Sequence, residues 1–458
     1  MKRILAGSVL LALSAAGVYG YFLSERERTY RQQIADGDAA LAHDNTFSAV
    51  EKFSGAIALK PDAMLGYLKR GQTYRRRGEF VAAIRDLRRA SELDPTATRP
   101  LEELGDAYLA DTPHRYASAA ERYEAYVRLD NRAPRVLYKL GFARYNEGHR
   151  TEAIEALQRA IQLDGKFAEA QYLLGLCEHD AQQPKLARVA LERAVQLQPT
   201  LLHAREELAD LYGEMGRPEE RLNQLEALAA LDPAASRDIA LGLAYARAGQ
   251  TDRAITTLGR ASERYPDNSY AFVALGRVWL ENAQAAGDRV ALSKALGALE
   301  GAVGTDDSSE ALTLFGRALL MTSDAESAER MLLDATRKTP VDPLAFAYLA
   351  DAAERLGHYT VARQALLDYD ALVGDADARG RTAHITRLGE LSLRVNEPGV
   401  AAVYFLRAAN GTDASLLARA ADAQLRAGDK DSARSTIGKA LELDPQNVLA
   451  GNVWRRLR

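Results

Sequence analysis

The sequence has little of the chemistry that disulfides and metal sites require. Cys177 is the single cysteine among 458 residues, so no disulfide can form within the chain. The seven histidines are scattered along the chain. His179 lies two residues from Cys177, and on a helix such residues point to different faces, which does not suit a shared metal ion. We therefore predict no metal site and no cofactor.

Short motifs of catalytic and nucleotide-binding sites are missing as well. The chain contains no GxxxxGK(S/T) phosphate loop, no GxGxxG fingerprint, no GxSxG elbow and no HExxH pair. Because each of these motifs places reactive groups at a fixed spacing, their absence removes the commonest routes to hydrolysis and phosphoryl transfer. We therefore expect a protein that is not an enzyme.

Neither sign of charge dominates the chain. The 59 basic and 63 acidic residues leave a formal net charge of −4, which gives no reason to expect nucleic acid as a partner. Proline is scarce, and its 14 residues mostly fall between helical segments rather than in a linker. Only 11 of the basic residues are lysine. This preference for arginine, together with abundant alanine, is typical of GC-rich bacterial genomes.

A pattern that recurs about every 34 residues fills the chain from roughly residue 30 to its end. In one unit the small residue Gly141 is followed twelve positions later by Ala153, and Ala153 four later by the large Leu157. Another alanine follows after three more positions, and many units close on a proline such as Pro199. The small residue that starts the series recurs as Gly37, Gly71, Gly105, Gly141, Gly175, Ala209, Gly242, Gly276, Gly316, Ala350, Gly389 and Ala421.

This pattern resembles the tetratricopeptide-repeat (TPR) family, in which each unit is an antiparallel pair of helices. The resemblance implies an all-α fold, a right-handed α-solenoid of about twelve helix pairs over residues 30–447. A small residue at the helix crossing lets two backbones approach closely, and a Leu or Phe fills the groove beside it. We expect residues 448–458 to form a helix that caps the array. The polar stretch at residues 373–381 is a candidate hinge.

The one long hydrophobic run lies at the amino terminus, within residues 1–29. Residues 4–23 carry no charge, and twenty helical residues at ~1.5 Å each span about 30 Å, the thickness of a bilayer core. A basic start and the small residues 14–17 also fit a secretory signal. The apolar run continues past them through Phe22, however, which favours an uncleaved anchor.

We therefore predict a single-pass protein of the bacterial inner membrane, anchored through residues 4–23, with its repeats in the periplasm. The alternative is a periplasmic or secreted protein after signal cleavage. Ala16 and Gly20 have the spacing at which two membrane helices can pack closely, which would allow self-association through the anchor.

In TPR arrays the first helix of each pair lines a concave groove that holds protein or peptide partners. The chaperone-binding members of the family carry Lys and Asn there to clamp a terminal carboxylate, and this chain lacks them, so heat-shock chaperone tails are not expected. Two adjacent repeats instead place aromatic side chains on the groove, which favours peptide or helix recognition. The alternative is that these side chains pack between repeats. The candidates are Tyr138, Phe142, Tyr145, Tyr172, Leu176 and His179.

Charge is segregated along the array. Glu206, Asp210 and Glu214 lie in the sixth repeat, whereas six arginines crowd the second. The arginines would contact anionic lipid headgroups or an acidic partner, or they would form a solvated helix face. They are Arg75, Arg76, Arg77, Arg85, Arg88 and Arg89.

We predict a non-enzymatic scaffold or adaptor that mediates protein–protein interactions at the cell envelope, in secretion, pilus assembly or polysaccharide export. This function rests on the family resemblance. One alternative is an organelle import receptor or co-chaperone, which the missing clamp residues weaken. Another is an accessory subunit of an enzyme complex such as a glycosyltransferase.

Overall fold

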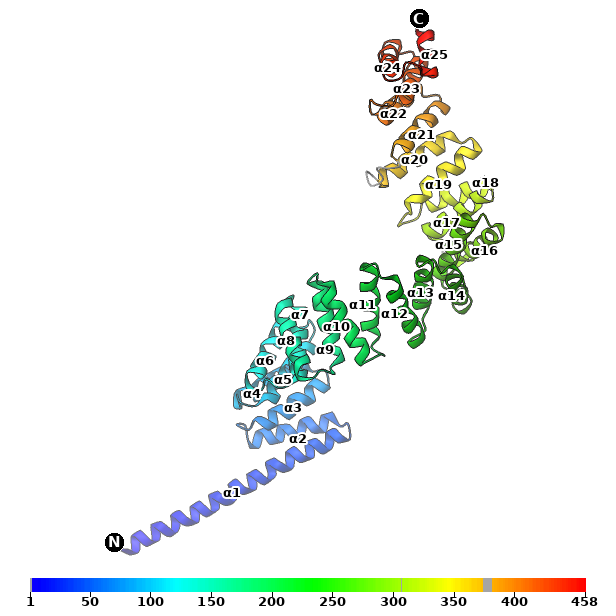
Figure 1. The fold of residues 1–458 in the computed structure, drawn as a ribbon. Helices are drawn as coiled ribbons and strands as arrows, with labels where there is room; N and C mark the ends of the chain where they lie inside the picture. The colour runs from blue at the N-terminus through cyan, green and yellow to red at the C-terminus, as the bar shows by residue number, and fades with distance from the viewer. Residues whose placement is uncertain (1, 306, 374–380) are drawn as a thin grey trace. The chain divides into compact units, whose positions relative to one another are not determined.

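The protein is helical throughout the part of the chain that the structure describes. The computed structural model describes residues 2–305, 307–373 and 381–458, with the side chains of residues 2–17 outside the description. Within these ranges it contains 25 α-helices and no strand (Figure 1). The predicted all-α class is therefore confirmed. The candidate hinge at residues 373–381 falls almost wholly on residues 374–380, which lie outside the described ranges.

The chain divides into two compact units, residues 1–217 (unit 1) and 218–458 (unit 2). Unit 1 contains α1 (Lys2–Ala42), α2 (Thr46–Leu59), α3 (Met64–Arg76), α4 (Phe80–Leu93), α5 (Thr98–Ala110), α6 (Tyr116–Leu129), α7 (Pro134–Asn146), α8 (Arg150–Leu163), α9 (Ala168–Asp180), α10 (Pro184–Leu197) and α11 (Leu202–Glu214). In unit 1 each odd-numbered helix from α1 to α9 packs against the helix that follows it, and each pair packs on the next.

Unit 2 repeats the arrangement, with pairs from α13 with α14 to α23 with α24. Both helices of the α15–α16 pair exceed the usual 13 and 14 residues. The helices of this unit are α12 (Pro218–Leu231), α13 (Ala235–Arg247), α14 (Thr251–Arg264), α15 (Ser269–Ala286), α16 (Arg289–Thr305), α17 (Ser309–Met321), α18 (Ala325–Ala335), α19 (Pro343–Leu356), α20 (Tyr359–Val373), α21 (Arg381–Arg394), α22 (Pro398–Ala409), α23 (Ala414–Arg426), α24 (Lys430–Leu443) and α25 (Val448–Leu457).

Close helix crossings hold each pair together. A Cβ atom added at Gly141 of α7 would lie 2.7 Å from Cγ of Leu157 in α8, closer than real carbon atoms approach. The predicted role of the small residue, to admit a large side chain from the second helix, is therefore confirmed. The same contact occurs at Gly71 with Leu87, Gly105 with Tyr123, Gly175 with Leu191, Gly242 with Leu258, Gly276 with Leu299, Gly316 with Leu332 and Gly389 with Phe405.

The turn inside most pairs contains one residue in the left-handed backbone conformation. Glycine suits this conformation because it has no Cβ to clash with the following carbonyl. It occupies the position in six pairs, for example at Gly148 with φ 84°. Four pairs place another residue there: Asp44, Gln182, Ser323 and Asn396, with φ between 58° and 67°.

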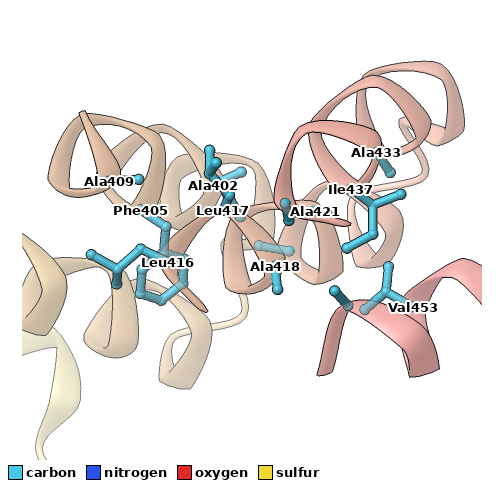
Figure 2. Packing of buried hydrophobic residues seen from close by; sticks show 14 of the residues in the cluster. Ala402, Phe405, Ala409, Leu416, Leu417, Ala418, Ala421, Ala433, Ile437 and Val453 are labelled. Carbon is cyan, nitrogen blue, oxygen red and sulfur yellow. The ribbon is translucent and has the colours of Figure 1, made fainter. Parts of the chain in front are cut away.

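The last repeats show how the core is built in unit 2. Phe405 of α22 and Leu416 of α23 pack against alanines of both helices, and Ile437 of α24 meets Val453 of α25 (Figure 2). All four side chains are buried. Alanine at the contact positions brings the helices close together, so a few large side chains fill the space between them. Helix α25 therefore belongs to the same core as the last full repeat.

The first helix extends unbroken from Lys2 to Ala42, through the boundary predicted at residue 29. Its carboxy-terminal part packs with α2, where Lys60 pairs with Glu27 and lies 5.1 Å from the centre of the Tyr30 ring. Tyr30 is buried at this contact. The first repeat is therefore formed by the end of α1 together with α2.

The predicted membrane location is wrong. Of the described helices, none has a stretch long and apolar enough to cross a bilayer. Among the residues of α1 whose side chains are described, only 18–24 precede the charged residues Glu25–Arg28, and a membrane-spanning helix needs about 20 apolar residues. The side chains of residues 4–17, including Ala16 of the proposed self-association motif, lie outside the described part of the chain.

Candidate protein-binding surfaces

Helices α7 and α9 each present three of the predicted groove residues on one face. Tyr138, Phe142 and Tyr145 lie on α7, at intervals of four and three residues that place them on a single helix face. The same intervals recur 34 residues later on α9, with Tyr172, Leu176 and His179. All six side chains are half-buried. We call these six residues the aromatic face.

Two rings of the aromatic face pack on aromatic residues that the sequence did not single out. The Tyr138 ring lies 5.1 Å from the Phe167 ring at the start of α9, and Phe142 lies 6.4 Å from Tyr116 at the start of α6. These centroid distances are typical of favourable aromatic pairs. The rings are therefore held in place between repeats while a part of each remains accessible.

Polar contacts join the aromatic face to the neighbouring first helices. The Tyr145 hydroxyl donates a hydrogen bond to Asp180 at 3.0 Å, and His179 Nε2 lies 2.9 Å from a carboxylate oxygen of Glu214 in α11. Burial, with the Asp180 carboxylate as a second cause, raises the pKa of Tyr145 to about 12. The Tyr145 hydroxyl is therefore neutral and fixed as a donor at physiological pH.

Carboxylates surround one end of the aromatic face. Burial raises the pKa of Glu207, and the nearby Asp210 and Asp180 add to the shift. The pKa of Tyr172 is also raised, mainly by burial and then by Glu207 and Glu206. We call Asp180, Glu206, Glu207, Asp210 and Glu214 the acidic margin. Of these, Asp180 and Glu207 were not among the acids noted in the sequence.

The structure separates the six predicted arginines. Arg75 binds Glu103 of α5 at 2.9 Å, and Arg76 binds Asp44 of the α1–α2 turn at 2.6 Å. Arg77 pairs with Glu79 and stacks over the Phe47 ring at 3.9 Å. The three consecutive side chains point in three directions because each helical residue is rotated by about 100° from the last.

The remaining three arginines gather around one hollow of about 590 Å³ in unit 1. Arg85, Arg88 and Arg89 line it from α4, at spacings of three and four residues that share a helix face. Arg70 of α3 and Arg115, which immediately precedes α6, complete the set. Sequence spacing could not link these two to the others, since they lie on different elements. We call this site the basic hollow.

The described residues hold no group of three or more His, Cys, Asp or Glu side chains that could bind a metal ion. Cys177 is fully buried in the core between α7 and α9, and burial raises the pKa of its thiol to about 12. Because the thiolate is the reactive form, this cysteine acts as a small apolar core residue.

Comparison with known proteins identifies the family. Sequence models described as "Tetratricopeptide repeat" match residues 34–98, 138–201, 239–310, 313–377 and 414–447, more than half of the chain. The chain belongs to the tetratricopeptide-repeat family. The matched ranges include all six residues of the aromatic face and every residue that lines the basic hollow except Arg115.

Three similar proteins each match a part of this TPR protein. The small glutamine-rich tetratricopeptide repeat-containing protein 2 of Mycosarcoma maydis is 29% identical over 108 residues, which cover 23% of this chain and 30% of that protein. The chain thus spans under a third of the relative's length. A crystal structure of MamA is 28% identical in sequence, and the match covers 35% of this chain and 94% of MamA at a TM-score of 0.34. The structure of pilF from Pseudomonas aeruginosa is 23% identical in sequence, and the match covers 46% of this chain and 96% of pilF at a TM-score of 0.37.

Proposed function

We propose that this TPR protein is a non-enzymatic scaffold that binds a protein segment on its aromatic face. The observation that carries the proposal is the pair of matching triplets on α7 and α9, whose six side chains are all half-buried. Aromatic rings that are held rigidly but remain accessible lose little entropy on binding and are frequent anchors at protein interfaces. The TPR fold is compatible with such protein–protein interactions.

The acidic margin favours a bound segment that carries Lys or Arg beside apolar side chains. Asp180 and Asp210 lie close enough to Glu207 to add to the rise in its pKa, which burial mainly causes. A basic side chain placed there would lower the repulsion among the carboxylates. The adjacent tyrosine rings would also attract a cation over their faces.

A role in secretion, pilus assembly or polysaccharide export remains a prediction from the sequence. The inner-membrane location that accompanied this prediction is wrong, since no described helix could cross a bilayer. On the described residues, no surface feature favours the alternatives, an import receptor or an enzyme-complex subunit, over a general scaffold.

A photocrosslinking experiment tests this function. The photoreactive residue p-benzoylphenylalanine replaces Leu176 on the aromatic face or, as a control, the exposed Gln158 on α8. We expect a partner to be captured at position 176 and not at 158, and its crosslinked peptide, identified by mass spectrometry, to contain basic and apolar residues. That peptide is then synthesised for affinity measurements.

The same partner peptide is titrated against Y138A/Y172A and against Y270A, a control that removes a tyrosine 67% exposed in unit 2. We expect the double variant to bind about tenfold or more weakly and Y270A to bind like wild type. Circular dichroism confirms that each variant is folded. Unchanged binding by a folded Y138A/Y172A would refute the proposal.

A further inference from the structure

Five arginines from three separate parts of unit 1 meet at the basic hollow. Arg70 comes from α3, the three arginines from α4, and Arg115 from the residue before α6. No residue of the aromatic face lines this hollow. It is therefore a separate surface from the one that carries the proposed function.

The hollow has more positive than negative charge. Asp86 accepts two hydrogen bonds from Arg70, at 2.6 and 3.1 Å, and lies 3.5 Å from Arg85, so one carboxylate serves two guanidinium groups. Arg89 pairs with Glu92 at 3.2 Å and Arg115 with Asp111 at 3.0 Å. Arg88 donates to the uncharged hydroxyl of Tyr108 at 3.0 Å. Five guanidinium groups thus meet three carboxylates.

Arg85 and Arg115 are each paired with a buried carboxylate, Asp86 and Asp111, and still reach solvent. Asp86 is buried, with its side chain 3% exposed, and Tyr108 is also buried, so both anchor points are rigid. The Arg85 side chain is 70% exposed and that of Arg115 50% exposed. Arginines that are held by buried partners and remain accessible can bind carboxylates with a lower entropy cost than freely moving ones.

An apolar wall adjoins these charges. Tyr67, Val81 and Ile84 line the same hollow, and Val81 is 76% exposed at the start of α4. A simple anion would gain nothing from this wall. A peptide that combines carboxylates with an aliphatic side chain would use both parts, because burial of the aliphatic group adds about 25 cal/mol per Å² of apolar surface.

We propose that the basic hollow binds an acidic peptide segment, with its carboxylates on Arg85, Arg89 and Arg115 and a neighbouring aliphatic side chain against Val81. The volume of about 590 Å³ has room for a few side chains rather than for a folded domain. The scaffold would then have a second docking site, with a charge preference opposite to that of the aromatic face.

The test uses a fluorescein-labelled peptide, EDLEDLED, titrated with the full chain and followed by fluorescence anisotropy. We expect saturable binding that R85E/R89E weakens about tenfold or more, because two attractive contacts become repulsive. The matched control is R31E/R193E, which makes the same change in net charge at two exposed arginines of α1 and α10. It should bind like wild type.

Two further peptides separate the contribution of charge to binding from that of the apolar wall. The neutral peptide QNLQNLQN should not bind, and EDAEDAED, which keeps the charge and shortens the aliphatic groups, should bind several-fold more weakly than EDLEDLED. The Y138A/Y172A variant should bind EDLEDLED normally, so the result is independent of the aromatic face. Circular dichroism confirms that all variants are folded.

Three results would overturn the proposal. Equal weakening by R31E/R193E would show a response to net charge alone. Equal affinity for EDAEDAED would show that the apolar wall has no part in binding. Arg85-dependent binding to phosphatidylserine vesicles, without binding to EDLEDLED, would identify a lipid surface as the occupant instead.

Discussion

The aromatic face and the basic hollow lie over the same kind of glycine–leucine helix crossing and carry opposite charge. A Cβ atom on Gly141, beneath the aromatic face, would lie 2.7 Å from Leu157, and one on Gly71, beside the basic hollow, would lie 2.7 Å from Leu87. The outward positions differ: one surface has rings bordered by carboxylates and the other has arginines beside aliphatic side chains. The comparison indicates that the glycine and leucine at each crossing determine the fold, and that the outward-facing residues determine which partner binds.

Removal of the carboxylate at the centre of the basic hollow should have the largest effect. The D86A substitution leaves Arg70, which is 16% exposed, without its bidentate partner, and breaking such a buried pair costs about 3 kcal/mol. We expect a lower urea midpoint and loss of peptide binding at the hollow, with the aromatic face unaffected. The control E92A removes an exposed carboxylate and should cost under about 1 kcal/mol. Equal costs for D86A and E92A would show that Asp86 does not organise the hollow.

Overpacking the helix crossing beneath either surface should cause the next largest loss of stability, and the loss should be equal for the two surfaces. G71A and G141A each force a methyl group against a leucine, and overpacking of this kind costs about 1–3 kcal/mol. Gly438 lies in α24 with no neighbouring atom within 4 Å, so G438A should be neutral or stabilising by about 0.5–1 kcal/mol. Urea denaturation measures all three. A difference above about 1 kcal/mol between G71A and G141A would show that the two crossings are not equivalent.

Glu207 of the acidic margin should make the stability of the protein depend on pH, an effect smaller than the two above. Because the folded pKa of Glu207 is raised, the native state binds its proton more tightly than the unfolded state does. The charged carboxylate therefore opposes folding at neutral pH, and this penalty disappears as the pH falls through the raised pKa to below 4.5. We expect E207Q to melt at a higher temperature than wild type at pH 7, with the difference shrinking toward pH 4. E155Q, at an exposed position of α8, is the control and should lack this trend.

The smallest expected effect concerns the turn between α9 and α10. Gln182 holds a φ of 59°, a conformation that disfavours residues with a Cβ, whereas the equivalent turn after α7 has Gly148. We expect Q182G to raise the free energy of unfolding by about 0.5–1 kcal/mol, since the relief of strain exceeds the added flexibility of the unfolded chain. Chemical denaturation checks the sign. A loss of stability would mean that Gln182 makes compensating contacts in the turn.

Much of the fold could be predicted from the sequence, whereas less of the two binding surfaces could. Gly141 and Leu157 touch within one helix pair and are only 16 residues apart in the sequence. Because the same two residue types recur at this spacing in other repeats, the contact could be predicted from the repeat pattern. The intervals of four and three residues likewise grouped Tyr138 with Phe142 and Tyr145. The membrane span predicted at residues 4–23 is wrong, since none of the described helices is long and apolar enough to cross a bilayer.

The sequence alone determined the helix pairs, their register and the small-on-large contact at each crossing, because these depend on neighbours in the same repeat. The tertiary structure decided which charged and aromatic side chains meet. Arg75 and Arg76 separate toward partners 28 and 32 residues away, and Arg70 reaches the three arginines of α4 only through the packing of two helices. Long polar side chains choose among several acceptors within reach, and only the stacking of repeats brings one of them into contact.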